Sequence, residues 1–338
     1  MKKPKIIICQ PIDNYFQWQI HLYVESCIEA GFTEEQIDVL LYKPKGREIN
    51  QEYWGKLKEY YPKLNVYIYE DNGVQQYLGI YIPILRPHLL WQHFSAHTEL
   101  ENETILYTDC DILWSKALDI EKLFDDDICY VSDASSYMNH SYFLSKERQV
   151  LNGKLEEYEA KDVVKGLCDI VGIDKEIVIE NDKNTGGVQY ILKNINADFW
   201  KKVQEDVLKI KIYLGQINKE FFKSTNEGIQ DWCADLWAIQ YNLWYAQKET
   251  KVVNEMSFSW STDNLDRLTQ CGIFHNAGVT GEFMDGVPYF YKGKYHQGLS
   301  PFSDPHLDVV LNNEESKKRC TWWYAHKLDE LRKKYNLT

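Results

Sequence analysis

Short apolar runs alternate with helix-like patterns along the first 110 residues. Phe16, Ile20, Val24 and Ile28 recur every four positions up to Gly31, which is typical of an amphipathic helix that ends at a glycine. Similar patterns predict strands at residues 5–9, 37–42, 65–69 and 104–108, and helices near residues 51–60 and 83–97. This alternation predicts right-handed crossovers and an α/β fold, with a Rossmann-like, mostly parallel sheet flanked by helices.

The pattern changes after residue 132. Residues 133–182 are polar, rich in Lys and Glu and weakly periodic, so we expect an insertion or a mobile flap with little apolar surface to bury. A glycine pair then precedes a strand that ends near residue 192, and further helices are predicted from residue 197, at residues 230–246 and at residues 314–335.

Charge and composition argue against some classes of function. The 338 residues include 38 basic and 51 acidic side chains, a formal net charge of -13. Affinity for nucleic acid needs an excess of Lys and Arg, so this balance argues against a nucleic-acid-binding protein but leaves a local basic patch open. No segment approaches the roughly 18 apolar residues of a membrane-spanning helix. The N-terminus also lacks the apolar part of a secretory signal, so we expect a cytoplasmic protein.

The eight cysteines are dispersed, without a C-x-x-C pair or a zinc-ligand spacing. Cytoplasmic thiols stay reduced, and a free cysteine commonly packs as a small apolar side chain. We therefore expect buried thiols and no disulfide framework.

The sharpest motif is Asp109-Cys110-Asp111, directly after the predicted strand at 104–108. Two carboxylates one residue apart can bind Mg²⁺ or Mn²⁺, and such a cation completes its coordination with substrate phosphates. Ligands of open α/β sheets bind at the carboxyl ends of strands, which is where this motif lies. A second pair with the same spacing, Asp125 and Asp127, precedes a predicted strand, so we expect it in a solvated turn.

His275 follows a short apolar segment far downstream, and Gly278 comes three residues later. A histidine in this position can add a nitrogen ligand to the cation, and a glycine lets the backbone approach a phosphate. Lys292 and Lys294 follow, and a lysine can neutralise charge on a diphosphate leaving group. A hydrogen-bonded core histidine is the alternative.

Asp231 and Asp235 are four residues apart, so on a continuous helix they would share one face, and both are candidate catalytic acids. An acid near a helix start is favoured by the helix dipole, which by itself accounts for Asp231. Asp235 lies among Trp232, Leu236 and Trp237, and an acid among aromatic residues can face a sugar as a general base or a hydroxyl anchor.

The succession of Asp109-x-Asp111, Asn184-Thr185-Gly186-Gly187, Asp235 and His275-x-x-Gly278 resembles the GT-A fold nucleotide-sugar glycosyltransferases. The resemblance implies that Asp109, Asp111 and His275 hold Mn²⁺ or Mg²⁺ against the donor diphosphate, with a UDP-sugar as the expected donor. It also implies a hexosyl- or pentosyltransferase activity.

Further roles come from the same resemblance. The loop after the first strand would contact the nucleotide base and ribose through Gln10, Pro11, Asp13 and Tyr15, and Arg86 would reach the donor. Asn184, Gly186 and Gly187 would border the donor sugar and the acceptor, and Asp235 would face the reaction centre. We therefore expect a glycosyltransferase domain at residues 1–305 and a helical extension at 306–338. The domain would comprise a nucleotide-binding half (1–132), the flap (133–182) and an acceptor and catalytic half (183–305).

More narrowly, residues 15–19, 232–238 and the histidine segment look like the plant hydroxyproline arabinosyltransferases and the base-J-type DNA glucosyltransferases. The resemblance does not identify the acceptor, whether a glycan, a protein or a nucleobase. Two alternatives remain. Asp-x-Asp after a strand is also the nucleophile motif of haloacid-dehalogenase-type phosphatases, and 11 Trp and 24 Tyr would suit a non-catalytic carbohydrate-binding protein.

Overall fold

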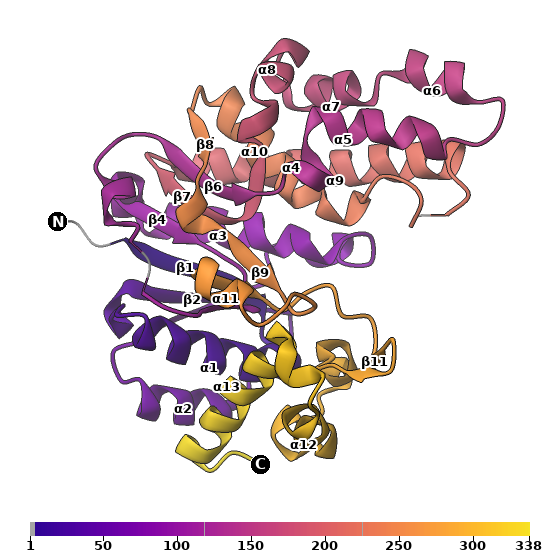
Figure 1. The fold of residues 1–338 in the computed structure, drawn as a ribbon. Helices are drawn as coiled ribbons and strands as arrows, with labels where there is room; N and C mark the ends of the chain where they lie inside the picture. The colour runs from indigo at the N-terminus through magenta and orange to yellow at the C-terminus, as the bar shows by residue number, and fades with distance from the viewer. Residues whose placement is uncertain (1–3, 118, 225) are drawn as a thin grey trace. The chain divides into compact units, whose positions relative to one another are not determined.

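The computed structural model describes residues 4–117, 119–224 and 226–338 (Figure 1). Within these residues, a seven-stranded sheet has the order β3-β2-β1-β4-β7-β6-β8 and is flanked by helices, which confirms the predicted α/β class. Its strands are β1 (Lys5–Pro11), β2 (Ile37–Lys43), β3 (Asn65–Glu70), β4 (Thr104–Tyr107), β6 (Cys129–Asp133), β7 (Gly186–Lys193) and β8 (Thr250–Val252). β1 runs parallel to β2 and β6 parallel to β8, whereas β7 is antiparallel to both β4 and β6.

The chain groups into two compact units, each built from separate stretches of sequence. Unit 1 contains Tyr69–Tyr107 and Glu121–Val253 together with Pro4 and Lys5, and unit 2 contains Ile6–Ile68, Thr108–Ile120 and Asn254–Thr338. These boundaries differ from the divisions at residues 132, 182 and 305 that the sequence suggested, because stretches far apart in sequence pack together.

Unit 2 contains the helices α1 (Asn14–Glu29), α2 (Gln51–Tyr60), α11 (Arg267–Gln270), α12 (Pro305–Asn312) and α13 (Cys320–Tyr335). A small sheet has the order β5-β10-β9, formed by β5 (Ile112–Trp114), β10 (Ile273–His275) and β9 (Phe258–Trp260), and a short hairpin joins β11 (Phe283–Met284) to β12 (Val287–Pro288). One apolar core includes Trp18 of α1, Phe274 of β10 and Tyr324 of α13. The helical segment after residue 305 is therefore part of the core of unit 2.

Unit 1 contains the helices α3 (Leu85–Ala96), α4 (Ser135–Met138), α5 (His140–Ser145), α6 (Leu155–Lys161), α7 (Val163–Val171), α8 (Lys175–Glu180), α9 (Ala197–Phe221) and α10 (Ala234–Tyr245). Five of these, α4 to α8, lie within the predicted flap, and α7 packs against α9 and α10. The flap buries Met138, Phe143, Tyr158, Leu167 and Val178, so the expectation of little apolar surface is wrong. Its helices span only 4–9 residues each, so each one offers at most about two turns of helical pattern.

All eight cysteines are buried, as their dispersal suggested. Within the described ranges, no helix is both long enough and apolar enough to span a bilayer.

The glycine at the start of β7 is required by packing inside unit 1. A Cβ atom at Gly186 would lie 2.3 Å from both the Ser132 carbonyl oxygen and Val131 Cγ2 of β6. We expect Gly186→Ala to lower the free energy of unfolding by about 1–3 kcal/mol, because backbone atoms cannot move aside as a flexible side chain could.

Gly55 provides the matched control, since a Cβ atom there meets nothing within 4 Å on the exposed face of α2. Gly55→Ala should raise stability by about 0.5–1 kcal/mol, because alanine favours the helix. Urea denaturation of both variants measures the difference, and equal midpoints would contradict the packing argument.

Candidate functional site

The Asp-x-Asp motif lies between two strands, after β4 and directly before β5. In unit 2 the Thr108 backbone N–H donates to the Ile7 carbonyl at 3.3 Å, and the Thr108 hydroxyl hydrogen-bonds the Tyr23 hydroxyl at 2.7 Å. These bonds hold the start of the loop against β1 and α1. Asp109 and Asp111 follow and are both half-buried.

Strand pairing brings His275 to this loop from more than 160 residues downstream. β10 pairs antiparallel with β5 so that His275 lies opposite Ile112, and the Asn276 N–H donates to the Asp111 carbonyl at 2.9 Å. His275 Nε2 consequently lies 3.6 Å from Asp111 Oδ1, and its ring stacks on Trp260 with centroids 5.0 Å apart. One potential ligand atom from each of Asp109, Asp111 and His275 falls within 4.8 Å of the others.

The charge on Asp111 is compensated within the site. Burial acts to raise the pKa of Asp111, but the Lys292 ammonium, which contacts Oδ2, and His275 together bring that pKa well below its ordinary value. Asp111 is therefore an ionised carboxylate, the form that binds metal ions. Its second oxygen, Oδ1, is buried without a hydrogen-bond partner.

The geometry of this cluster is compatible with a divalent cation. Two carboxylates and an imidazole are hard and borderline donors that together suit Mn²⁺ and related ions, and Mg²⁺ accepts the carboxylates. A cation would bind the Asp111 oxygen that accepts no hydrogen bond, and leaving a buried polar oxygen without one is costly.

The loop after β1 belongs to the same unit. Gln10 is buried at the end of β1, Pro11 is half-buried, and Asp13 pairs with Arg47. Tyr15 stacks on His296 with centroids 4.0 Å apart and an interplanar angle of 23°. Burial raises the pKa of Tyr15 and the nearby Asp111 carboxylate raises it further, so the phenol stays protonated close to the Asp-x-Asp loop.

The two lysines predicted for the diphosphate have different surroundings. Lys292 contacts Asp111, whereas Lys294 lies 2.6 Å from Glu282 and 2.8 Å from Asp304. Gly278 follows His275 with φ of +82°, a backbone conformation that favours glycine. The structure thus brings Lys292 alone of these two lysines to the metal-ligand cluster.

Two predicted residues of unit 1 pair with each other. Arg86 Nη1 lies 2.6 Å from Asp235 Oδ2, and the two side chains are 24% and 3% exposed. The Tyr81 hydroxyl donates to Asp235 Oδ1 at 2.7 Å. Both oxygens of the Asp235 carboxylate therefore have partners.

Asp231 and Asp235 do not share a helical face. Asp231 lies in a 3-10 turn (Asp231–Cys233), and α10 begins only at Ala234, so the continuous helix predicted from residue 230 is wrong at its start. Asp231 Oδ2 instead lies 2.8 Å from Lys211 Nζ of α9.

The glycine pair is enclosed by unit 1 itself. A Cβ atom at Gly187 would lie 2.9 Å from the Tyr190 hydroxyl and 3.5 Å from Leu236 Cβ. Asn184 is half-buried before the pair, and its carbonyl accepts a hydrogen bond from Thr250 Oγ1 at 3.2 Å.

The sequence analysis missed three residues that contact the predicted site residues. Tyr81 donates a hydrogen bond to Asp235, His296 stacks on Tyr15, and Trp260 stacks on His275. Tyr81 lies in an irregular stretch without periodicity. Trp260 was visible only as one of 11 tryptophans. His296 lies in the Gly- and aromatic-rich stretch, where the pattern of residues distinguishes no single position.

No protein-family model matches the sequence, and no curated protein matches it significantly. Similar solved structures include the apo form of the bifunctional glycosyltransferase WbbM, which is 9% identical with a TM-score of 0.42, over 97% of this chain and 52% of that one. Another is apo mouse xyloside xylosyltransferase 1, which is 11% identical with a TM-score of 0.37, over 82% of this chain and 98% of that one. The chain thus spans about half the length of WbbM, and the function has to be argued from the site itself.

The Arg86–Asp235 pair predicts a specific stability pattern. Arg86→Met leaves a buried carboxylate without its cation, and we expect a loss of about 3 kcal/mol, the low end for a broken buried pair because Arg86 is partly exposed. The double variant Arg86→Met/Asp235→Leu should lose clearly less stability than Arg86→Met, since it removes both charges. Urea denaturation of the two single variants and the double variant measures the coupling. Additive losses would contradict the pairing.

Proposed function

We propose that the protein is a metal-dependent glycosyltransferase of the GT-A type that transfers a sugar from a nucleoside diphosphate donor, with a UDP-sugar as the expected donor. The observation that carries this proposal is the cluster of Asp109, Asp111 and His275, with an unpartnered buried carboxylate oxygen and a lysine beside it. A cation and a lysine at one strand end suit a diphosphate, whose charge has to be neutralised when it leaves.

Asp109, Asp111 and His275 would hold the cation, with Mn²⁺ or Mg²⁺ as the candidates. When bound, the cation would supply electrostatic stabilisation of the negative charge that develops on the leaving diphosphate. Trp260 holds the His275 ring in place by stacking, and the β5–β10 pairing fixes its distance from Asp111.

Lys292 has two tasks in this proposal. Without a cation it compensates the Asp111 carboxylate, and once a cation takes over that charge its ammonium can turn to the phosphate. Lys294 would hold the segment that carries Lys292 in place through its ion pairs with Glu282 and Asp304. Gly278, which has no side chain, would allow the backbone to approach the phosphate closely.

The loop with Gln10, Pro11, Asp13 and Tyr15 would take the base and ribose. Asn184, Gly186 and Gly187 would border the donor sugar and the acceptor. Arg86 is the more exposed member of the Arg86–Asp235 pair, so Asp235 would act at the sugar by orienting that guanidinium. Asp231 would hold α9 through Lys211.

The first test is metal-dependent turnover. Purified protein is mixed with a panel of UDP-sugars and Mn²⁺, with and without EDTA, and UDP release is measured. Asp111→Asn should reduce release about a hundredfold while the protein stays folded, because it halves the charge of the carboxylate pair. Asp125→Asn, in the exposed second Asp-x-Asp sequence, is the matched control and should keep full activity.

The same assay separates the alternatives. Full turnover of Asp111→Asn in EDTA would overturn the proposal. Metal-dependent cleavage of p-nitrophenyl phosphate without UDP release would favour a phosphatase, and binding of sugars with neither reaction would favour a carbohydrate-binding protein.

The contact between Lys292 and Asp111 leads to a second, independent prediction about Mn²⁺ affinity. Its ammonium competes with a cation for Asp111, and an opposite charge at this range changes the proton affinity of a carboxylate by about one to three pKa units. Lys292→Met should therefore bind Mn²⁺ about tenfold more tightly than the unsubstituted protein, as measured by electron paramagnetic resonance titration without nucleotide. Weaker Mn²⁺ binding in a variant with an unchanged melting temperature would contradict the competition.

A further inference from the structure

One short segment of unit 2 contacts two groups of the proposed donor site. Residues 292–298, called the strap below, consist of a 3-10 turn and the glycine that ends it. Lys292 at the start of the strap contacts Asp111 Oδ2. His296 near its end stacks on Tyr15, with ring centroids 4.0 Å apart and an interplanar angle of 23°. A single turn of chain therefore covers both the metal-ligand cluster and the residue expected to contact the base.

The two contacts resemble those that a bound metal ion and nucleotide would make. The ammonium of Lys292 supplies positive charge to the ionised Asp111 carboxylate, as a cation would. The imidazole of His296 lies nearly parallel to the Tyr15 ring, which is how an aromatic base would stack there. Tyr15 is 7% exposed with the imidazole in place, so this face of its ring is closed to a base. The strap and a nucleotide thus compete for the same groups.

The middle of the strap is anchored, whereas its end lies at the surface. Tyr295 is buried, its ring stacks on Phe290, and its hydroxyl donates to Asp304 Oδ2 at 2.7 Å. His296 and Gly298 are exposed, and the Gly298 N–H donates to the Tyr295 carbonyl at 3.0 Å within the same turn. Because this end buries little surface, it can move about Tyr295 without disturbing the core of unit 2.

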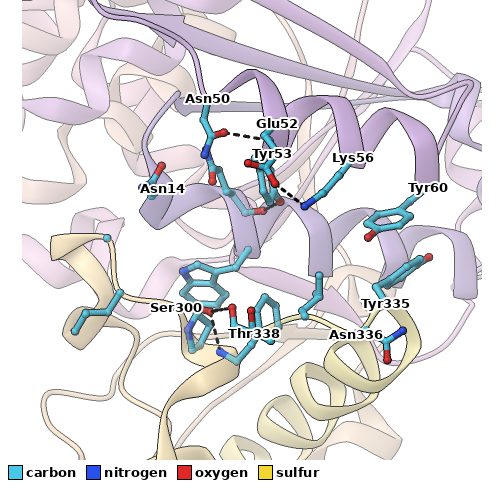
Figure 2. A pocket seen from close by; sticks show the side chains of 17 residues that line it. Asn14, Asn50, Glu52, Tyr53, Lys56, Tyr60, Ser300, Tyr335, Asn336 and Thr338 are labelled. Atoms are coloured by element: carbon cyan, nitrogen blue, oxygen red, sulfur yellow. Dashed lines mark hydrogen bonds and ion pairs between the residues drawn. The ribbon is translucent and has the colours of Figure 1, made fainter.

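The last residue of the strap rests on the first turn of α1. A Cβ atom at Gly298 would lie 3.9 Å from Asn14 Cβ, and Asn14 directly precedes Tyr15. A cavity of about 380 Å³ adjoins this contact, with Asn14, Gly298 and Ser300 among the residues that line it (Figure 2). The end of the strap thus has open space beside it and lies within reach of a crosslink to α1.

We propose that the strap closes the donor site of the free protein and that a metal–nucleotide complex opens it. The base displaces the His296 ring from Tyr15, and the cation displaces the Lys292 ammonium from Asp111. This inference rests on the proposed function, because it adds a conformational step to donor binding at that site. The strap acts as an autoinhibitory contact, since the measured nucleotide affinity is reduced by the fraction of molecules that are open.

A disulfide that holds the strap against α1 is the first test. Disulfides need a Cβ–Cβ distance of about 3.5–4.5 Å, and Asn14→Cys/Gly298→Cys would place its two Cβ atoms 3.9 Å apart. All eight native cysteines are buried, so dithiothreitol acts on the engineered pair. Calorimetric titration with UDP and Mn²⁺ should show at least about tenfold weaker binding by the oxidised form, with recovery on reduction.

Inorganic pyrophosphate with Mn²⁺ is the matched ligand, because it has the diphosphate but no base. Lys292 lies on the other side of the Tyr295 anchor from the crosslink, so its ammonium stays free to turn. Pyrophosphate should therefore bind the oxidised and the reduced variant with the same affinity. A loss confined to UDP assigns the effect to the face of Tyr15.

His296→Ala tests the same step without a crosslink. The variant uncovers the Tyr15 face, so UDP with Mn²⁺ should bind about two- to tenfold more tightly, as expected for the loss of one competing aromatic pair. His326→Ala is the matched control, because His326 also stacks on an aromatic ring, Trp322 of α13, with centroids 5.2 Å apart. It should leave the UDP affinity unchanged.

Three results would overturn the proposal: equal UDP affinity of the oxidised and the reduced crosslink variant, an equal loss of UDP and pyrophosphate, or weaker UDP binding by His296→Ala. The last result would make the imidazole part of the bound site. Failure of the proposed function gives a different pattern. In that case neither the unsubstituted protein nor His296→Ala binds UDP with Mn²⁺, and both proposals fall together.

Discussion

The buried negative charge of Asp111 is the constraint on which the candidate site depends. Its side chain is 14% exposed, and a carboxylate in that position has to be matched by positive charge or by a cation. The two groups that match it, Lys292 and His275, come from the last third of the chain. The same third supplies Phe274 and Tyr324 to the apolar core around Trp18, so the packing of unit 2 and the electrostatics of the site form together.

Hydrogen bonding distinguishes two buried carboxylates of unit 1, Asp206 and Asp235, from Asp111 in the candidate site. Asp206 is buried on α9, and its two oxygens contact Lys202, Lys209 and Asn242. Asp235 is equally enclosed, with both oxygens bonded. Asp111 is more exposed than these acids, at 14%, and its Oδ1 accepts no hydrogen bond. Since buried polar atoms are almost always hydrogen-bonded, this exception beside a histidine and a second acid is compatible with a divalent-cation site.

Local patterns were enough to predict the strands β1, β2 and β4, which are short continuous runs of buried residues, and the helix α1, where Phe16, Ile20, Val24 and Ile28 recur every four positions. They also located Asp109, Asp111 and His275, whose positions at strand ends are a local signal. They failed where packing is set by distant residues. The helices between residues 133 and 182 span only a few residues each, which is too short for a confident prediction. Lys292 and Lys294 look alike in sequence, although only Lys292 reaches Asp111. Their difference is fixed by Glu282 and Asp304, which no spacing rule connects to them.

Helix α1 shows how a buried helix accommodates its polar side chains. It is buried on almost every side, so its polar residues need partners inside the protein. Gln19 donates to the Tyr15 carbonyl at 2.8 Å, and Glu25 accepts from the Tyr61 hydroxyl at 2.6 Å. Burial lowers the pKa of His21 to about 4, which keeps its ring neutral between Tyr60 and Tyr335. Gln17 Nε2 and His21 Nε2 have no hydrogen-bond partner, so burial of this helix leaves part of its polar surface uncompensated.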